Sequence, residues 1–472
     1  MLKTSNINKI SKFLIISLFL ISQMLNNNIL LTIIRNIHTK IKYFIKFIFI
    51  FLLNIKKSKK YINTTNYNKS DYKIKIAIYS HSLSNGGIER NTALFLKYLS
   101  KFKIFELYLF NKKKTPNEYK IPINVKRIII NYEKKFLKRI LFKNKIDIFI
   151  YQLYDVEMLE MLKKLKKIKI IIYIHSCFLY WVYMNDNYIL NNIYNEYKSF
   201  KYVISLIPFE NDYLFKKWGI NSIYMDNFLT YEYEKVIPSY LSSNKILMLG
   251  RAEDKNKRFD LGIRAMKYII KEIPKSQMII ISDDKEIDSL KKIIKLLSLE
   301  DNIKFVGYTS TPEIYFKDAS IHIFPSIAEA FPMVLSETKI YGIPNILLGI
   351  DYVSTSKGGV IMIYDENPKT IANISIQILK NDTFRKKLGR DARKSMQKYN
   401  NEILYKKWVK LILEIDNGDD FYNLLINNSK VINENESIYI LNNQAKLLQK
   451  RIPNLFNITI NDILNFSFLN YI

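Results

Sequence analysis

The sequence predicts an α/β protein made of two doubly wound, Rossmann-like domains that follow one another along the chain. Short β-branched and aromatic runs alternate with helical stretches, which is the pattern of a parallel sheet covered by helices. The alternation pauses at residues 226–243, where Pro238 and several serines interrupt it, and it starts again at Lys245. With 472 residues, the chain is long enough for two such domains with well-buried cores.

Net charge narrows the possible partners without choosing among them. Lys and Arg total 73 against 43 Asp and Glu, a formal net charge of +30. A basic chain attracts the phosphates of nucleic acids, anionic lipids or nucleotides. A bias towards Asn, Lys, Ile and Tyr, as an AT-rich genome gives, explains the same excess. Because the basic residues are spread along the chain and form no recognised nucleic-acid module, we do not expect a nucleic acid as partner.

Cysteine and histidine usage argues against a disulfide framework and against a Cys-based zinc site. The chain has one cysteine, Cys177, and its four histidines are scattered: His38, His81, His175 and His322. We therefore expect no metal site and no required cofactor. The single cysteine is compatible with a reducing, cytosolic location of the two predicted domains.

The first 70 residues differ from the rest of the chain. Apolar runs at 13–25 and 43–53 are flanked by lysines, and each is shorter than the ~20 residues that cross a bilayer. No small-residue cleavage site follows the first run. An interfacial anchor, a weak transmembrane helix and a helical hairpin packed on the protein are the alternatives. We favour membrane attachment through residues 13–53, with the basic flank and the catalytic domains on the cytoplasmic side.

The first domain, predicted at residues 71–228, begins with a strand at 73–79 and a helix at 91–99. Gly86 and Gly87 lie between them, where a glycine pair lets the backbone approach a ligand closely. An ordinary turn is the alternative, and the spacing is not that of the dinucleotide fingerprint. Further strands are expected at 105–110, 125–130, 146–151, 168–174 and 202–206.

His175 follows the strand at 168–174 directly. Ligands of doubly wound sheets bind outside the carboxyl ends of the strands, which makes this histidine a candidate site residue. A structural role is the alternative for a single histidine in this place.

The second domain, predicted at 242–398, opens with a strand at 245–249 and a helix at 259–272. Arg251, Lys255 and Lys257 come after the strand end, where cations neutralise an anionic ligand. Solvated surface charge is the alternative. Later elements are expected at 278–281, 303–306 (followed by Gly307), 311–319, 365–372 and 382–397.

The stretch 320–344 predicts a strand at 321–324, a loop and a helix at 333–341 that ends at Gly342 and Pro344. Pro332 suits the first position of this helix. Backbone N–H groups at the helix start and the helix dipole together favour an anion such as a diphosphate. The residues of this predicted anion site are Phe331, Pro332, Met333 and Val334.

Two carboxylates flank the predicted anion site. Glu329 precedes it and Glu337 lies inside the helix, so each can accept hydrogen bonds from sugar hydroxyls on its own side of a diphosphate. Two surface glutamates on an ordinary connection are the alternative.

The whole stretch resembles the retaining glycosyltransferases of family 4, which have the GT-B fold. Their signature is two glutamates separated by seven residues, written around an E-A-F-P/G-x-V-x-x-E core and closed by G-x-P. The matching residues are Glu329, Ala330, Phe331, Pro332, Val334, Glu337, Gly342 and Pro344. The family's G-G-x-E-R motif is matched by Gly86, Gly87, Glu89 and Arg90.

The resemblance, which covers roughly residues 73–415, implies a GT-B fold with two Rossmann-like domains facing a cleft. The apolar runs of the first 70 residues add an N-terminal hydrophobic extension in front of them. The resemblance also implies a crossover helix at 399–416 that returns to the first domain. The Asn-rich tail at 417–472 lies outside the resemblance and is open between a helical appendix and partial disorder.

The resemblance also implies roles for particular residues. Glu329 is expected to contact the donor sugar, and Glu337 the ribose of the nucleotide. Arg251 and Lys257 are expected to stabilise the leaving diphosphate, and His175 to lie close to the reacting sugar. Gly86 and Gly87 are expected to line the cleft that faces the donor, and Gly307 to lie just before the region that contacts the base.

Two departures from the family pattern affect the nucleotide side. Counted from Arg251, the lysine of the family's G-R-x-x-x-x-K motif comes one residue after Lys255 and one residue before Lys257. We assign the phosphate role to Lys257. Residues 282–284 replace the family's G-x-G turn.

The sequence therefore predicts a retaining hexosyltransferase that needs no metal. Its donor would be a UDP- or GDP-sugar, and its acceptor a glycan, a lipid-linked molecule or another envelope component. A catalytically silent nucleotide-sugar binder and, less favoured, a basic polyanion-binding protein are the alternatives.

Overall fold

The computed structural model describes residues 73–84, 86–130, 134–183, 192–252, 255–282, 287–417 and 434–451. The apolar runs within 13–53, Asp283, Asp284 and residues 452–472 lie outside these ranges. None of the helices in the described part of the chain combines the length and the apolar character that crossing a bilayer requires. Membrane attachment through residues 13–53 therefore stays a prediction.

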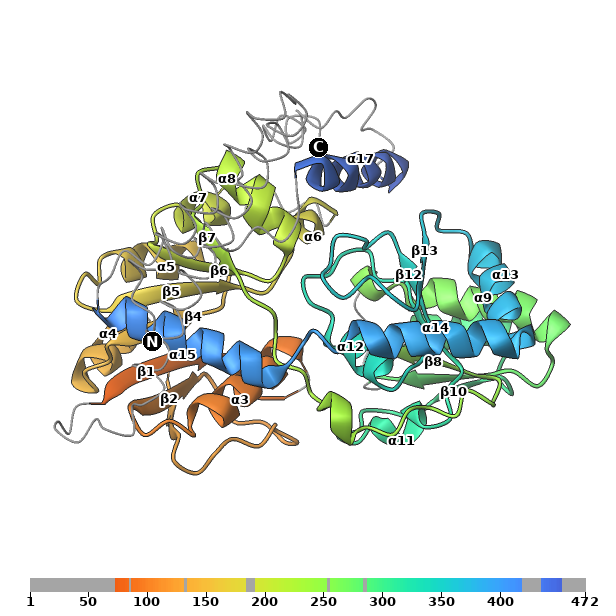
Figure 1. Cartoon of the computed structure of the whole chain (residues 1–472), viewed down its shortest axis with the longest axis horizontal. Helices are drawn as coiled ribbons and strands as arrows, with labels where there is room; N and C mark the ends of the chain where they lie inside the picture. Colours follow the sequence, from red (N-terminus) through yellow and green to blue (C-terminus); the bar gives the residue numbers. More distant parts are fainter. Residues whose placement is uncertain are drawn as a thin grey trace, which may run out of the picture. The chain divides into compact units, whose positions relative to one another are not determined.

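A first parallel sheet has seven strands in the order β3-β2-β1-β4-β5-β6-β7 (Figure 1). In its centre, Ile76 of β1 pairs with Leu107 of β2 on one side and with Ile148 of β4 on the other. The strands are β1 (Ile74–Ser80), β2 (Phe105–Asn111), β3 (Lys126–Ile129), β4 (Ile148–Tyr151), β5 (Lys169–Ile174), β6 (Tyr202–Ser205) and β7 (Ser222–Tyr224). The helices between them are α3 (Gly87–Leu99), α4 (Lys134–Lys143), α5 (Val156–Lys163), α6 (Phe178–Tyr183), α7 (Tyr194–Tyr197) and α8 (Phe215–Lys217).

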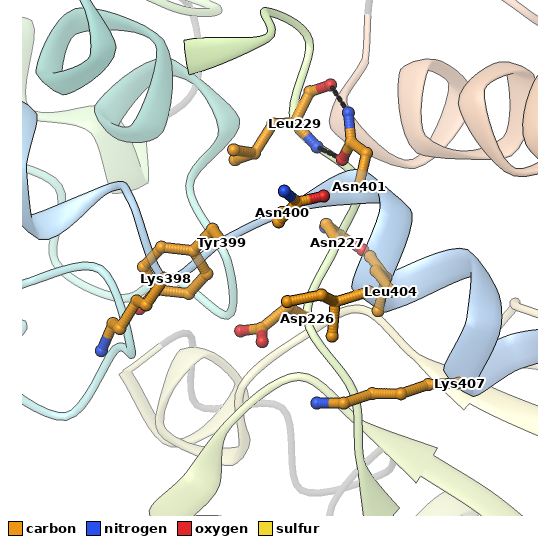
Figure 2. A pocket seen from close by; sticks show the side chains of 10 residues that line it. Asp226, Asn227, Leu229, Lys398, Tyr399, Asn400, Asn401, Leu404 and Lys407 are labelled. Atoms are coloured by element: carbon orange, nitrogen blue, oxygen red, sulfur yellow. Dashed lines mark hydrogen bonds between the residues drawn. The ribbon is translucent and has the colours of Figure 1, made fainter. Parts of the chain in front are cut away.

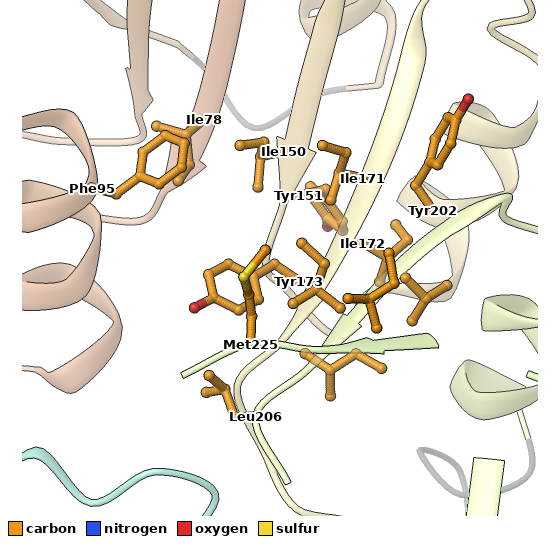
Figure 3. Packing of buried hydrophobic residues seen from close by; sticks show 14 of the residues in the cluster. Ile78, Phe95, Ile150, Tyr151, Ile171, Ile172, Tyr173, Tyr202, Leu206 and Met225 are labelled. Atoms are coloured by element: carbon orange, nitrogen blue, oxygen red, sulfur yellow. The ribbon is translucent and has the colours of Figure 1, made fainter. Parts of the chain in front are cut away.

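The core of this sheet explains why its strands read as continuous apolar runs. Ile78, Ile150 and Ile171 come from three neighbouring strands and are buried together with Phe95 of α3 (Figure 3). Both faces of a parallel sheet are covered by helices, so successive side chains are buried instead of alternating with polar ones.

A second parallel sheet has six strands in the order β10-β9-β8-β11-β12-β13. The strands are β8 (Lys245–Leu249), β9 (Gln277–Ile281), β10 (Ile303–Phe305), β11 (Ile321–Phe324), β12 (Asn345–Leu348) and β13 (Val360–Ile363). The helices are α9 (Phe259–Glu272), α10 (Asp288–Leu296), α11 (Glu313–Phe316), α12 (Met333–Ile340), α13 (Pro368–Lys380) and α14 (Asp382–Ser395).

Two helix boundaries differ from the sequence prediction for identifiable reasons. Helix α13 begins three residues after the predicted start at 365, because Pro368 takes the first helical position and the Asn367 side chain accepts the N–H of Lys369. Helix α3 begins at Gly87 and not at residue 91, since the glycine pair itself forms the start of the helix.

In each sheet the strand order reverses at one place. The first sheet runs outwards on one side of β1 and returns at β4, and the second runs outwards from β8 and returns at β11. Because all these strands are parallel, the loops after β1 and β4, and those after β8 and β11, leave the same edge of their sheets. Such switch points are where doubly wound sheets bind ligands.

The chain passes between the sheets twice, through residues 225–244 and again before α15 (Asn401–Asn417). Helix α15 packs on the first sheet: its Trp408 is fully buried and meets Phe95 edge-on, with ring centroids 4.9 Å apart. Asn401 joins the two passages, since its side chain accepts the N–H of Leu229 at 2.7 Å and donates to the Leu229 carbonyl at 2.9 Å (Figure 2).

A pocket of about 30 Å³ lies beside this junction, lined by Asp226, Lys398, Lys407 and their neighbours (Figure 2). Its lining contains none of the predicted site residues. A volume of this size holds only one or two water molecules, so the pocket is too small for a nucleotide sugar.

The last described element is α17 (Glu434–Arg451), drawn in dark blue in Figure 1. Its Gln444 and Leu447 are buried. This part of the Asn-rich tail is therefore helical and packed.

Asn401→Ala should lower the free energy of unfolding by about 1–3 kcal/mol, because it leaves the buried N–H and carbonyl of Leu229 without these partners. Denaturant unfolding of the full chain measures the loss. Ile403→Ala, at an exposed position in the same helical turn, is the control. An equal effect from both variants would contradict this role of Asn401.

Candidate active site

The central feature of the second sheet is an ion pair at its switch point. Lys257 follows β8 and Glu329 follows β11, and Lys257 Nζ lies 2.5 Å from Glu329 Oε1. The side chains are only 17% and 13% exposed. Because little water reaches them, each charge is stabilised mainly by the other and by neighbouring protein groups. Lys257 also lies over the ring of Phe324, 5.5 Å from its centroid. The geometry assigns Lys257 to the site, whereas Lys255 is exposed.

Asn256 holds the loops that carry this ion pair. Its side-chain amide donates to the carbonyl of Ala328 at 2.9 Å and accepts the N–H of Ala328 at 3.0 Å. Its backbone carbonyl accepts the N–H of Ile327, also at 2.9 Å. Because Asn256 directly precedes Lys257 and Ala328 directly precedes Glu329, these three bonds fix the two charged residues relative to one another.

Helix α12 begins four residues after Glu329, at Met333, and it has no side-chain cap because Pro332 occupies the capping position. Its first-turn N–H groups and its dipole favour negative charge at this end. Gly342, with φ of +70°, ends the helix as predicted, because a residue with a side chain rarely adopts that conformation. The helix therefore offers an anion site next to Glu329.

Glu337, inside α12, is almost completely buried and is paired with residues of other segments. Its Oε1 accepts hydrogen bonds from Arg90 of α3 and, at 2.7 Å, from the Thr230 hydroxyl. Arg90 also donates to the Tyr119 hydroxyl at 3.2 Å and lies over the Tyr119 ring. Burial acts to lower the pKa of Arg90, but Glu337 and Tyr119 raise it overall, so the guanidinium stays charged.

The glycine pair lies at the start of α3, near the start of α12. A Cβ added to Gly87 would lie 3.5 Å from Met333 Cγ. A Cβ at Gly86 would overlap the carboxylate of Glu89, which folds back over this residue. Burial raises the pKa of Glu89, and the nearby positive charge of Arg251 opposes that rise. Only glycine leaves room at residue 86 for the carboxylate in this position.

His175, at the end of β5, is oriented by Gln152, at the end of β4. The Gln152 amide N–H₂ donates to the Tyr79 carbonyl at 2.9 Å and to the Thr92 hydroxyl at 3.1 Å. Its Oε1 is therefore an acceptor, and the 2.7 Å contact with His175 Nε2 places the imidazole proton on Nε2. Nδ1 is left as an acceptor. Loss of water around the ring lowers the pKa of His175 to about 3, so the ring is neutral near pH 7.

A buried carboxyl group supports the segment that follows His175. Glu210 accepts the N–H of Phe178, the first residue of α6, at 2.6 Å. Burial raises the pKa of Glu210 to about 8, so this side chain is mostly protonated at neutral pH. Cys177 lies nearby, and burial followed by the effect of Glu210 raises the pKa of its thiol. These effects keep the buried thiol protonated near neutral pH.

The structure brings several predicted site residues together and leaves others apart. Glu329 and Lys257 are in direct contact, and the Phe331–Val334 stretch begins α12 directly after them. The Glu89 side chain lies next to Gly86 and near the positive charge of Arg251, and Met333 lies next to Gly87. Gly307 lies after β10 with φ of +71°, and no described contact joins it to the ion pair. At the departure from the G-x-G turn, the Ser282 hydroxyl accepts the N–H of Ala252 at 2.9 Å.

Sequence reasoning missed three residues of this region. Gln152 and Asn256 are buried amides, and Tyr352 accepts the N–H of Glu329 at 3.1 Å. Gln152 had a usable signal, because a polar residue directly after a buried strand lies at the ligand edge of the sheet. Among the described residues, no cluster of His, Cys, Asp or Glu side chains has the arrangement of a metal site.

Comparison with known proteins finds a match to a family model over the part of the chain that forms the second sheet. Residues 231–395 match the family model described as "Glycosyl transferases group 1". This range contains all six strands of the second sheet and both Glu329 and Glu337.

Two curated relatives match about the same share of the chain. The poly(glycerol-phosphate) alpha-glucosyltransferase of Bacillus subtilis is 26% identical over 184 residues, which cover 38% of this chain and 25% of that protein. The poly(ribitol-phosphate) alpha-N-acetylglucosaminyltransferase of Staphylococcus aureus is 26% identical over 180 residues, which cover 37% of this chain and 36% of that protein. The match thus spans about a quarter to a third of the length of these relatives.

A solved structure extends the similarity to both sheets. HepE of Anabaena, in complex with UDP and glucose, superposes with a TM-score of 0.60 at 14% identity, covering 72% of this chain and 100% of that chain. This likeness confirms the predicted α/β fold with two parallel sheets.

Glu210→Gln should become progressively more stable than the unchanged chain as the pH rises from 5 to 8. The folded state keeps a proton on Glu210 up to about pH 8, whereas the unfolded state releases it above the usual value of 4.5. The unchanged chain therefore loses stability over this interval, and the glutamine variant does not. Denaturant unfolding at several pH values measures the difference, with exposed Glu160→Gln as the control. A difference that does not change with pH would contradict the raised pKa.

Proposed function

We propose that this chain is a retaining glycosyltransferase that moves a sugar from a nucleotide sugar to a glycan or another envelope acceptor. The observation that carries the proposal is the Lys257–Glu329 pair at the β8–β11 switch point, directly before the uncapped start of α12. The cation and the start of the helix suit the diphosphate of a nucleotide sugar, and the carboxylate suits the hydroxyl groups of its sugar. The match of residues 231–395 to group 1 glycosyltransferases supports the same assignment.

In the proposed reaction, the bond between the sugar's anomeric carbon and the diphosphate breaks while the acceptor oxygen bonds to that carbon from the same face. The acceptor's proton passes to the departing phosphate oxygen, so the products are the glycoside and the nucleoside diphosphate. Lys257, Arg251 and the N–H groups of α12 stabilise the negative charge that develops on the diphosphate. Positioning and charge stabilisation supply most of the rate.

Glu329 is proposed to hold the donor sugar through its hydroxyl groups. The carboxylate is already fixed by Lys257, and its loop is fixed by Asn256. A group held in this way loses little entropy when the sugar binds, which favours a defined orientation of the anomeric carbon.

Glu337 is proposed to bind the ribose, as the family resemblance implies. Arg90 and Thr230 both bond to Oε1 of this carboxylate. Ribose binding therefore uses Oε2 or replaces Arg90. If the ribose binds Oε2, Arg90 stays in place and couples α3, which packs on the first sheet, to the nucleotide side of the second.

His175 is proposed to face the reacting sugar with Nδ1. Because Nε2 donates to Gln152, the lone pair of Nδ1 accepts a hydrogen bond from a sugar or acceptor hydroxyl. The ring is a hydrogen-bond acceptor and not a proton donor in this role, since it is neutral near pH 7.

UDP-sugars are the first donors to test, because a structure with the same two-sheet fold holds UDP and glucose. The two relatives are transferases of poly(glycerol-phosphate) and poly(ribitol-phosphate), which favours phosphate-containing polymers as acceptors for this chain. A polymer or lipid-linked acceptor also agrees with the predicted membrane attachment through residues 13–53. With that attachment, the catalytic domains are proposed to lie on the cytoplasmic side.

The full chain should release nucleoside diphosphate from one member of a panel of UDP- and GDP-sugars, and Glu329→Gln should lower the rate about 100-fold or more. Coupled detection of the nucleoside diphosphate measures the rate. Glu300→Gln, at an exposed position of the same domain, should retain it. Binding of a nucleotide sugar without release would point to a catalytically silent binder and would contradict the transferase assignment.

Lys257→Ala should reduce release of nucleoside diphosphate about 100-fold, whereas Lys255→Ala should change it less than about threefold. The two lysines are separated by one residue, but only Lys257 contacts Glu329. Steady-state kinetics of both variants gives the comparison. A larger loss at Lys255 would show that the other lysine serves the phosphate.

A further inference from the structure

Tyr352 links the Glu329 loop to the segment after His175. Residues 349–359, between β12 and β13, form what we call the β12 loop. Tyr352 in this loop is buried, and its hydroxyl accepts the N–H of Glu329 at 3.1 Å. The same hydroxyl lies 3.4 Å from the Cys177 thiol, two residues after His175. The Tyr352 hydroxyl thus contacts both the Glu329 loop and the segment that follows His175.

Helix α17 holds the beginning of the β12 loop. The side-chain amide of Gln444 donates to the Gly349 carbonyl at 2.7 Å and to Asp351 Oδ1 at 3.2 Å. Asn443 donates to Asp351 Oδ2, also at 3.2 Å. The buried side chain of Leu447 lies so close to Gly349 that an added Cβ would be 2.5 Å from Leu447 Cδ1.

The β12 loop depends on these contacts because it contains a poorly hydrated carboxylate. Burial raises the pKa of Asp351, and the hydrogen bonds from Asn443, Tyr364 and Gln444 oppose that rise. Two of these three donors come from α17. A half-buried carboxylate that loses its donors costs free energy, so we expect the loop without α17 to move and to expose Asp351 to water. Tyr352 is the next residue and would move with it.

We propose that α17 is a positioning element of the active site. Gln444 holds the β12 loop, the loop places the Tyr352 hydroxyl, and that hydroxyl fixes the backbone of Glu329. Gln444 and Tyr352 are positioning residues, since they act through Glu329. This inference rests on the proposed transferase function, and it extends the functional unit beyond residues 231–395, the range that matches the family model.

Tyr352→Phe is the first variant, because it keeps the ring that packs edge-on against Phe209 and removes only the hydroxyl. We expect kcat for nucleoside diphosphate release to fall about 10-fold or more, while KM for the nucleotide sugar changes less than about twofold. Equal loss of binding and turnover, or no change in kcat, would overturn the role of the hydroxyl.

Gln444→Ala, alone and combined with Tyr352→Phe, tests whether α17 acts through Tyr352. We expect the single variant to lower kcat several-fold and to cause no further loss when the hydroxyl is already missing. Asn442→Ala, at an exposed position of the same helix, is the control and should retain activity. Losses that multiply in the double variant, or an equal loss in the control, would overturn the proposal.

Hydrogen exchange of the full chain separates failure of this inference from failure of the proposed function. The Glu329 amide should exchange faster in Tyr352→Phe and in Gln444→Ala than in the unchanged chain or in Asn442→Ala. Faster exchange in a chain that turns over no nucleotide sugar would support the linkage and reject the transferase assignment. Unchanged exchange in an active chain would reject the linkage and leave the transferase assignment intact.

Discussion

The ion pair between Lys257 and Glu329 is the interaction on which the rest of the site depends. Both groups are largely removed from water, so each would be costly to bury without the other. Strand order brings them together, because β8 and β11 are neighbours in the sheet although 72 residues separate the two charged groups in the chain. The surrounding contacts, from Asn256 to Tyr352, hold the loops in which this pair forms.

In each sheet a buried amide beside the switch point holds the loop of a neighbouring strand. In the first sheet, Gln152 after β4 orients His175 after β5, and in the second, Asn256 after β8 holds the loop after β11. In both cases a buried amide satisfies backbone or imidazole groups of a neighbouring loop. Amides suit this position because they donate and accept at once and carry no charge that must be desolvated. These amides fix His175 and the loops that carry Lys257 and Glu329.

Local sequence signals predicted much of this architecture. Strand β11 and helix α9 have the predicted bounds, since β-branched runs and amphipathic spacing are read within one element. The short strands β7 and β12 were not predicted. The pairing of Arg90 with Glu337 could not be predicted either, because it joins residues 247 positions apart and depends on how the chain folds as a whole. The role of α17 could not be predicted for the same reason. The sequence left residues 417–472 open between a helical appendix and partial disorder, and only the fold shows that Gln444 meets the β12 loop.

The most direct test of this account is a calorimetric titration of the full chain with UDP and with GDP. The account predicts that one of the two binds to a single site, and that added salt weakens the binding, because a diphosphate is held by Lys257, Arg251 and a helix dipole. Absence of binding by both nucleotides under low-salt conditions would contradict the assignment of the β8–β11 switch point as a nucleotide-sugar site.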